Sequence, residues 1–355
     1  MIHTHVGPAV LARSIKDWGR GLGFQAVGIT DTDLAEAERH LLDWLSAGRH
    51  GEMAYMARHG TRRSRPEALV PGTLRVICAR MDYFPPGDDP HLRLADPASA
   101  YISRYALGRD YHKLLRIRLQ RLADRIGAAV GPFGYRVFVD SAPVLEKALA
   151  TKAGLGWIGK HTNLIARETG SWFFLGEIYT DLPLPVDAPV GDHCGTCSAC
   201  IEACPTGAIV GPYRLDARLC ISYLTIELEG PIPPNLRPLL GNRVYGCDDC
   251  QLVCPWNRFA RPGSEADFLP RHGLDSATLC ALFAWDEAEF LRRTEGSAIR
   301  RIGHARWLRN LAVALGNSRG GPAVGRALRG RADHASPVVR EHVAWALARV
   351  TRRDR

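Results

Sequence analysis

The sequence has no long apolar segment. In 355 residues, no run of apolar side chains approaches the roughly 18 that a membrane-spanning helix needs. The first residues, MIHTHVGPAVLARSIKDWGRG, show no basic segment followed by an apolar stretch and do not predict a secretory signal. The pair Arg62-Arg63 lies too far inside the chain to be a twin-arginine export signal. We therefore expect a cytoplasmic protein with no membrane association.

Cysteine is scarce outside one short segment. Of ten cysteines, eight lie between Cys194 and Cys254, whereas Cys78 and Cys280 stand alone in apolar settings and are expected to be buried thiols. Because the cytoplasm keeps thiols reduced, the clustered eight predict metal or redox chemistry and not disulfides. The length and the 46% hydrophobic content suffice for two or three globular domains.

Acidic residues are scarce near the C-terminus. Residues 291–355 hold fifteen arginines against four acids, a net charge of +11 in a chain whose total is +9. The rest of the chain is therefore close to neutral. This basic tail, residues 291–355, indicates binding to a polyanion such as nucleic acid, with a solvated basic face as the alternative.

The clustered cysteines follow a known iron–sulfur pattern. Residues 194–205, CGTCSACIEACP, match the C-x2-C-x2-C-x3-C-P run of bacterial ferredoxins, in which three cysteines bind one 4Fe–4S cluster and the fourth binds another. Residues 247–255, CDDCQLVCP, repeat the ending without the leading cysteine, a place that Cys220 can fill. A zinc site prefers two separated C-x2-C pairs and fits this run badly.

The crossing rule of this motif assigns every clustered cysteine. The predicted ligands are Cys194, Cys197, Cys200 and Cys254 for the first cluster, and Cys204, Cys220, Cys247 and Cys250 for the second. Two clusters that share ligand loops must lie close together. Electron transfer is therefore the minimum function that the sequence predicts.

Hydrophobic periodicity predicts regular structure on both sides of the cysteines. We expect helices at 11–23 and 111–130, and strands at 24–30, 74–81 and 135–140. Helical patterns return from residue 274, notably at 304–317 and 336–350, the second with Pro337 at its first position.

The predicted fold is an α+β multidomain protein. It comprises an α/β layer domain over residues 1–182, a ferredoxin-like two-cluster domain over 183–262, and a C-terminal α-helical HEAT-like repeat over 263–355.

The segment VDSAPVLEKALATKAGLGWIGKHTNLI at 139–165, together with YGCDDCQLVCPWN at 245–257, resembles epoxyqueuosine reductase over nearly the whole chain. The resemblance implies that the α/β domain binds cobalamin and that the tail binds tRNA. It also implies reduction of the epoxide of epoxyqueuosine, at the wobble position of the tRNA anticodon, to give queuosine.

Gly154, Gly159 and Lys160 satisfy the G-x4-G-K pattern of a nucleotide-binding loop. His161 occupies the Ser/Thr position of that motif, and the preceding segment predicts a helix where such a loop needs a strand, so we reject this interpretation. We expect the glycines to let the backbone approach a bulky cofactor.

Asp140 follows the predicted strand at 135–140 and precedes a predicted helix that begins near Pro143. One interpretation makes it the N-cap of that helix. By the resemblance it is instead the catalytic carboxylate, which protonates the epoxide oxygen and needs a raised pKa to do so. We favour the catalytic interpretation because Ser141 can provide the cap.

Other residues match family segments around the cofactor or substrate. They are Arg63, Ser103, Tyr105, Lys160, His161, Asn163 and Tyr223. His112 and His161 could ligate cobalt in principle, but the resemblance implies cobalamin without a protein histidine ligand.

The expected mechanism starts at an external electron donor such as ferredoxin or flavodoxin. Electrons pass through the clusters to cobalamin, and the tRNA anticodon stem-loop docks on the basic tail of a monomeric enzyme. A reductive dehalogenase-like corrinoid enzyme, a ferredoxin-type electron carrier and a nucleic-acid-binding protein with structural clusters are the alternatives.

Overall fold

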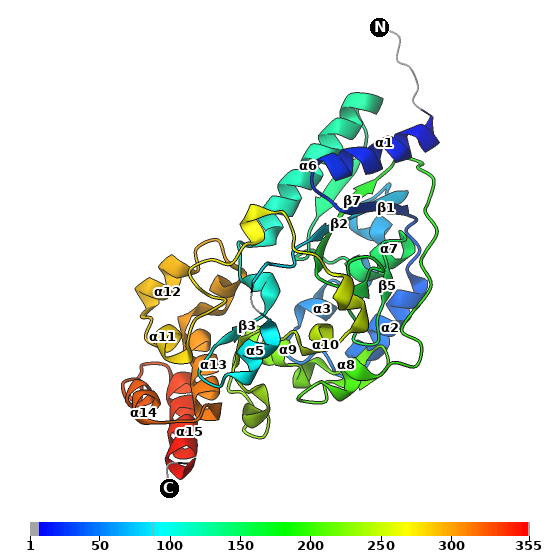
Figure 1. Cartoon of the computed structure of the whole chain (residues 1–355). Coiled ribbons are helices and arrows are strands. Elements are labelled where there is room, and N and C mark those ends of the chain that lie inside the picture. The colour runs from blue at the N-terminus through cyan, green and yellow to red at the C-terminus, as the bar shows by residue number, and fades with distance from the viewer. Residues whose placement is uncertain (1–6, 88, 354–355) are drawn as a thin grey trace.

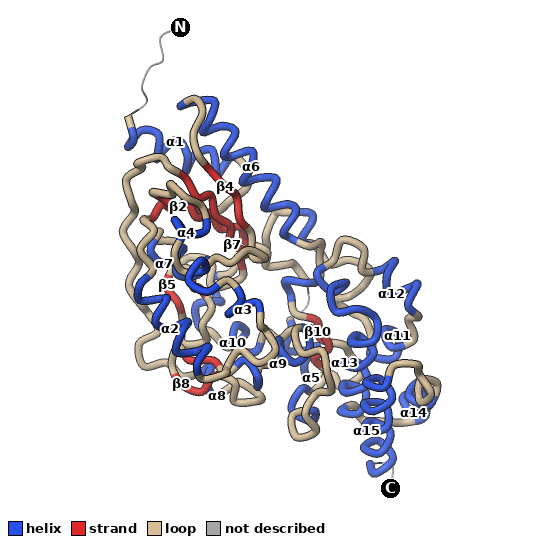
Figure 2. Tube along the Cα trace, turned by 180° about the vertical axis from the view of Figure 1, so that it is seen from behind, coloured by secondary structure: helices blue, strands red, loops and turns tan. Residues whose placement is uncertain are grey.

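The computed structural model describes residues 7–87 and 89–353, which form an elongated molecule (Figure 1). Helix α1 (Pro8–Gly21) and helix α15 (Pro337–Arg353) lie at opposite ends of it. A sheet occupies the end near α1, and a group of helices occupies the end near α15 (Figure 2). No helix in the described residues is both long and apolar enough to cross a membrane.

The main sheet has four strands in the order β1-β2-β7-β4. They are β1 (Ala26–Thr30), β2 (Arg75–Asp82), β7 (Phe173–Thr180) and β4 (Tyr135–Phe138). The predictions of β1, β2 and β4 are confirmed, whereas the central strand β7 was not predicted. All eight residues of β7 are buried, because the sheet is covered on both faces.

Helices cover the two faces of this sheet. Helix α1 and helix α6 (Tyr111–Val130) pack on one face, and α7 (Glu146–Lys152) packs on the other. Both α1 and α6 were predicted from their apolar spacing. Each pair of neighbouring strands is antiparallel, so the expected α/β domain is a layered α+β arrangement and not a parallel one.

The cysteine segment contains only short elements. Helices α8 and α10 carry the repeated cysteine motifs and pack against each other. Their N-cap residues, Ser198 and Asp248, have the same backbone angles, φ −120° and ψ 4°, so the two motifs repeat one local structure. The elements are α8 (Ala199–Glu202), β8 (Ile209–Gly211), β9 (Arg214–Leu215), α9 (Ile221–Ile226), β10 (Arg243–Tyr245) and α10 (Asp249–Leu252).

The C-terminal helices enclose a separate core. Helix α13 packs mainly on α15, and their buried side chains include Trp307, Leu311 and Val343. Predictions of both helices are confirmed. The helices are α11 (Leu279–Phe283), α12 (Glu287–Arg293), α13 (Gly303–Asn317), α14 (Pro322–Arg329) and α15.

This helical core includes residues from earlier in the chain. The short strand β3 (Tyr101–Ile102) pairs in parallel with β10, and both lie beside α13 (Figure 2). Residues Ala100 to Leu107, with Val244 and Tyr245, contribute to the core of the helices. The three predicted domain ranges remain predictions, but their cores are not independent.

The remaining elements of residues 7–87 and 89–353 lie around these layers. They are α2 (Ala35–Ser46), α3 (Tyr55–Arg58), α4 (Pro66–Leu69), α5 (Pro90–Ala95), β5 (Trp157–Ile158), β6 (Leu164–Ile165) and seven 3-10 turns, of which η5 (Pro255–Phe259) and η7 (Ala298–Ile302) adjoin the functional residues.

Candidate functional site

The four cysteines predicted for the first cluster surround one cavity. Cys194, Cys197, Cys200 and Cys254 line a space of about 220 Å³ beside Trp256. Loop and helix geometry bring them together, because the first three lie at the start of α8 and the fourth directly precedes η5. The dimensions and the four sulfur donors fit a group larger than a single ion.

Of the other four cysteines, Cys204, Cys220 and Cys250 lie close to one another and next to Cys200 of the first set, and Cys247 packs against the same apolar cluster as Cys220. The electrostatic neighbours of the Cys250 thiol include the thiols of Cys220 and Cys204, whereas those of Cys254 include Cys194 and Cys197. Within residues 7–87 and 89–353, no three His, Cys, Asp or Glu side chains converge as closely as a single metal ion requires.

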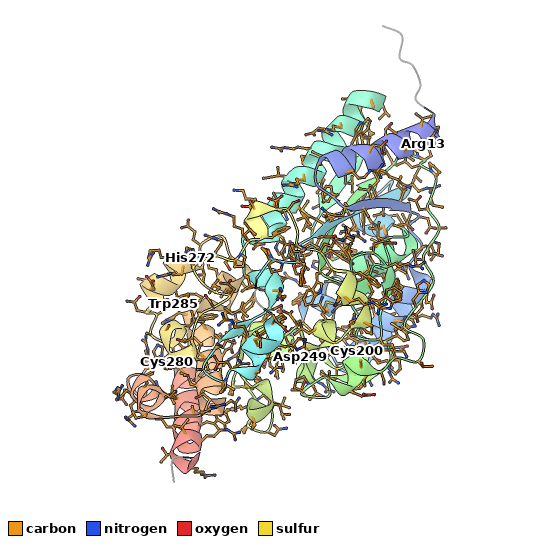
Figure 3. All side chains as sticks on the ribbon, viewed as in Figure 1. Arg13, Cys200, Asp249, His272, Cys280 and Trp285 are labelled. Atoms are coloured by element: carbon orange, nitrogen blue, oxygen red, sulfur yellow. The ribbon has the colours of Figure 1, made fainter. Side chains whose placement is uncertain are left out.

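The two isolated cysteines lie outside this region. Cys78 is buried in β2, and burial raises the pKa of its thiol. Cys280 in α11 is only half-buried, in contrast to the buried thiol that we expected. Figure 3 shows Cys280 among the C-terminal helices, well away from Cys200 and Asp249.

Asp140 lies directly after β4 in a left-handed backbone conformation. Its φ is 48°, a region that Asp and Asn enter more readily than most residues. Its backbone N–H donates to Oε1 of Glu146 at 2.6 Å. This bond bridges the turn between β4 and α7.

The capping interpretation of Asp140 is wrong. Helix α7 begins at Glu146, and its N-cap is Leu145, with no side-chain hydrogen bond. The alternative cap, Ser141, instead donates from its hydroxyl to the Val139 carbonyl at 3.4 Å. The physical reason is that tight turns at Ser141 and Val144 delay the helix beyond Pro143.

The Asp140 carboxylate is held by two side chains from the start of α6. Tyr111 donates its hydroxyl to Oδ2, and Nε2 of His112 lies 3.2 Å from the same oxygen. Burial alone would raise the pKa of Asp140, but the hydrogen bonds from His112 and Tyr111 outweigh it and lower the pKa. This direction is opposite to the raised pKa that the sequence led us to expect.

Four of the residues expected around the cofactor or substrate already have protein partners. Ser103 donates to Asp248 at 2.6 Å, and the hydroxyls of Tyr105 and Tyr245 are 3.4 Å apart. The Tyr223 hydroxyl accepts the backbone N–H of Glu52 at 2.8 Å. The Lys160 ammonium donates to the carbonyls of Gly195 and Cys197, so it supports the first cysteine loop.

Two other expected residues keep buried polar atoms without a partner. Arg63 donates from Nη2 to the Tyr55 carbonyl, but its Nε has no hydrogen-bond partner. His161 accepts the N–H of Asn163 at Nδ1, and its Nε2 has none. Burial lowers the pKa of His161 to about 4, so its ring is neutral. Such unpaired buried atoms are the kind that a bound polar group satisfies.

Lys147 connects the second cysteine set with Asp140. Lys147 is exposed, and its ammonium donates to the Thr162 carbonyl at 3.1 Å and to Oδ1 of Asn163 at 3.0 Å. The charges that act on it are those of Cys250, Asp140, Glu146 and Cys220. The sequence analysis missed Lys147, and its place on α7 facing these groups could not be found from spacing alone.

The glycine-rich segment serves the packing of the protein itself. A Cβ at Gly154 would lie 2.6 Å from the Ala188 carbonyl oxygen, and one at Gly159 would lie 2.5 Å from Ile165. These glycines therefore have a packing reason of their own, and the expectation that they let the backbone approach a cofactor stays a prediction. The rejection of a nucleotide-binding loop is confirmed, because helix α7 and not a strand precedes the segment.

Several arginines of the basic tail are structural. Arg309 is fully buried and donates to the carbonyls of Leu224, Leu228 and Gly230. Others, including Arg326 and Arg329 on α14, are exposed. The positive charge that the tail exposes for binding a polyanion is therefore smaller than the +11 counted from its sequence.

Comparison with known proteins gives the family. Residues 63–141 match the family model "Epoxyqueuosine reductase QueG, DUF1730", and residues 193–257 match "4Fe-4S double cluster binding domain". The chain is 66% identical to an epoxyqueuosine reductase from Pseudomonas aeruginosa, covering 96% of this chain and 95% of that protein. It is 60% identical to the one from Escherichia coli, covering 95% and 89%.

Solved structures agree with these relatives. The structure resembles that of an epoxyqueuosine reductase with an epoxyqueuosine-modified tRNA stem loop, with a TM-score of 0.86 at 28% identity, covering 96% of this chain and 90% of that one. The enzyme from Streptococcus thermophilus matches with a TM-score of 0.85 at 26% identity, covering 96% and 90%. The match of residues 193–257 to the 4Fe-4S double cluster family favours iron–sulfur clusters over the zinc site considered from the sequence. This chain belongs to the epoxyqueuosine reductase family.

Proposed function

We propose that this chain reduces the epoxide of epoxyqueuosine, at the wobble position of a tRNA anticodon, to give queuosine. The observation that carries the proposal is the junction at Lys147, whose ammonium lies within the electrostatic reach of Cys220 and Cys250 of the second cysteine set and of the Asp140 carboxylate. An electron-transfer centre and a proton donor thus meet at one place, in a chain 66% identical to a curated epoxyqueuosine reductase.

The double-cluster domain would deliver the electrons. We assign Cys194, Cys197, Cys200 and Cys254 to one 4Fe–4S cluster, and Cys204, Cys220, Cys247 and Cys250 to the other. Cys197 is exposed, whereas Cys250 faces Lys147. An external donor such as ferredoxin or flavodoxin would therefore reach the first cluster from the surface, and the second cluster would lie next to the reaction.

Cobalamin is the cofactor that these residues fit. The unpaired Nε of Arg63 and Nε2 of His161 would supply buried polar contacts for its amides, and Asn163 lies beside His161. When bound and reduced, cobalamin would supply a strongly nucleophilic, strongly reducing cobalt centre for opening the epoxide, by bonding to a carbon or by electron transfer. No histidine ligand to cobalt is assigned.

The protein's own groups do the remaining work. Asp140 passes a proton to the epoxide oxygen as the C–O bond breaks, while Tyr111 and His112 hold its carboxylate in place. The exposed arginines of the C-terminal helices, which we infer to be a HEAT-like unit, bind the phosphates of the tRNA anticodon stem-loop. We infer a monomeric enzyme that acts in the cytoplasm, where its tRNA substrate is found.

The test is direct conversion of the modified nucleoside. The anaerobically purified chain, reconstituted with both clusters and cobalamin, is incubated with tRNA that carries epoxyqueuosine and a chemical reductant. Digestion and mass spectrometry should show queuosine, the product that lacks one oxygen atom. Clusters that are reduced and reoxidised while the nucleoside stays unconverted would indicate a ferredoxin-type electron carrier and refute the proposal.

A further inference from the structure

A histidine lies between two carboxylates at the start of helix α6. Asp110 is the N-cap of this helix, and its Oδ1 lies 2.6 Å from Nδ1 of His112. On the other side of the ring, Nε2 lies 3.2 Å from Oδ2 of Asp140. Both ring nitrogens therefore face carboxylate oxygens.

With Asp110 and Asp140 both ionised, this geometry requires a protonated ring. An ionised carboxylate only accepts hydrogen bonds, and a neutral imidazole has a single N–H to donate. Both contacts are satisfied only by the imidazolium form. Burial of the ring lowers the pKa of His112, but the hydrogen bonds with Asp110 and Asp140 outweigh this effect and raise it to about 9.

The other groups around Asp140 are less suited to supply a proton. Tyr111 donates its hydroxyl to the carboxylate, but burial raises its pKa well above the ordinary value. Arg301 of η7 faces Asp140 as a permanent positive charge, because its pKa is raised further by Glu227 despite burial. The pKa of Glu146 on α7 is raised to about 7 by burial and by the charge of Asp140, but its Oε1 accepts the backbone N–H of Asp140 and does not contact the Asp140 carboxylate. The Lys147 ammonium donates to Thr162 and Asn163.

The reaction itself sets the number of protons. Conversion of an epoxide to an alkene breaks both C–O bonds and forms a C=C bond. It consumes two electrons, which come from the external donor through the clusters, and two protons, and the oxygen leaves as water. An ionised Asp140 can donate nothing until it receives a proton.

We propose that His112 holds the proton for this reaction between Asp110 and Asp140 and delivers it through Asp140 to the epoxide oxygen. The inference rests on the proposed function above. Asp140 remains the catalytic residue, because it alone would touch the substrate, and His112 is a positioning residue that acts through it.

The same contacts allow the proton to be replaced. After transfer, the neutral ring keeps its Nδ1–H on Asp110, and Nε2 becomes an acceptor. The His112 side chain is 29% exposed, so water can return a proton to it. The second proton then follows the route of the first.

The experiment compares pH profiles of single-turnover reduction of epoxyqueuosine in tRNA. His112→Gln keeps a polar side chain of similar reach but cannot carry the charge. Asp110→Asn keeps the helix cap and the contact to Nδ1 but removes one carboxylate. His40→Gln, an exposed position on α2, is the matched control. Cluster content, cobalamin content and tRNA affinity are measured for every variant.

The wild-type rate should stay level through neutral pH and fall above about pH 9, as His112 loses its proton. In His112→Gln the rate at pH 7 should fall roughly 10²-fold or more, and this alkaline fall should disappear. In Asp110→Asn the alkaline fall should move to lower pH, because one of the two stabilising carboxylates is gone.

The outcomes separate this proposal from the proposed function. A wild-type chain that leaves epoxyqueuosine unchanged would refute the proposed function. An active wild type with a His112→Gln variant of equal rate and equal pH profile would refute the proton-holding role alone. If His112→Gln loses cofactor or tRNA affinity, the test rests on the pH profile of Asp110→Asn. An Asp110→Asn rate that falls at the same alkaline pH as the wild-type rate would overturn the proposal.

Discussion

Glu146, which is half-buried, and Glu177, which is fully buried, form a carboxyl pair beside Asp140, and replacing Glu146 should stabilise the protein in a pH-dependent way. Glu177 on β7 is fully buried, and neither carboxyl oxygen has a hydrogen-bond partner. Burial, and then the charge of Asp140, raise the pKa of Glu146 to about 7. Glu146→Gln keeps the shape and the oxygen that accepts the Asp140 N–H.

The size of the effect follows from this pKa. A carboxyl whose pKa is raised on folding costs no stability below its ordinary value of 4.5, and the cost grows until the pH reaches about 7. At roughly 1.4 kcal/mol per pH unit, the wild type loses about 2 kcal/mol by pH 6 and about 3 kcal/mol by pH 8. Glu146→Gln avoids this loss.

The assay is anaerobic thermal unfolding of the cluster-loaded wild type and variant from pH 5 to pH 8. The melting temperature of Glu146→Gln, relative to wild type, should rise with pH by roughly 5 °C. Glu36→Gln, an exposed position on α2, should show a constant difference. A constant difference for Glu146→Gln as well would mean that the Glu146 carboxyl does not titrate in this range, and the reasoning would be refuted.

Three further outcomes are expected. Anaerobic analysis should give about eight iron and eight sulfide per chain, and stoichiometric zinc without iron would contradict the cluster assignment. Asp140→Asn should keep its left-handed turn and both cofactors but lose roughly 10²- to 10⁴-fold in turnover, so a wild-type rate would place the proton elsewhere. The double variant Arg326→Gln/Arg329→Gln should reduce the slope of the logarithm of tRNA affinity against the logarithm of salt concentration, by an amount that corresponds to about one phosphate contact per arginine. Arg13→Gln at the far end of the molecule should leave it unchanged (Figure 3).

Local patterns predicted most of the regular structure. Helices α6, α13 and α15 have clear apolar spacing with a cap, proline or glycine at an end, and each was placed within a few residues. Strand β7 was missed because its sequence, FFLGEIYT, shows no alternation that distinguishes a strand from a buried helical segment. The antiparallel order of the sheet depends on long-range pairing, which local patterns do not contain.

The candidate site was predictable where the spacing of residues along the sequence determines it. The ligands of the first cluster, Cys194, Cys197, Cys200 and Cys254, were grouped from the ferredoxin motif, and the structure places them around one cavity. Asp140 was found through family resemblance. Its contacts with Tyr111 and His112 were not, because they join two segments almost 30 residues apart, and their effect on its pKa depends on distances that only the fold sets.

The shared core of the C-terminal helices has an evolutionary consequence. Since Ala100 to Leu107 and Tyr245 are packed inside it, the tail cannot be gained, lost or exchanged between relatives as an independent module. If the tail binds tRNA as proposed, a change in which tRNA is accepted would arise by point substitutions on its exposed surface. A chimera that joins this tail to another relative would recover activity only if residues 100–107 and 243–245 were transferred with it.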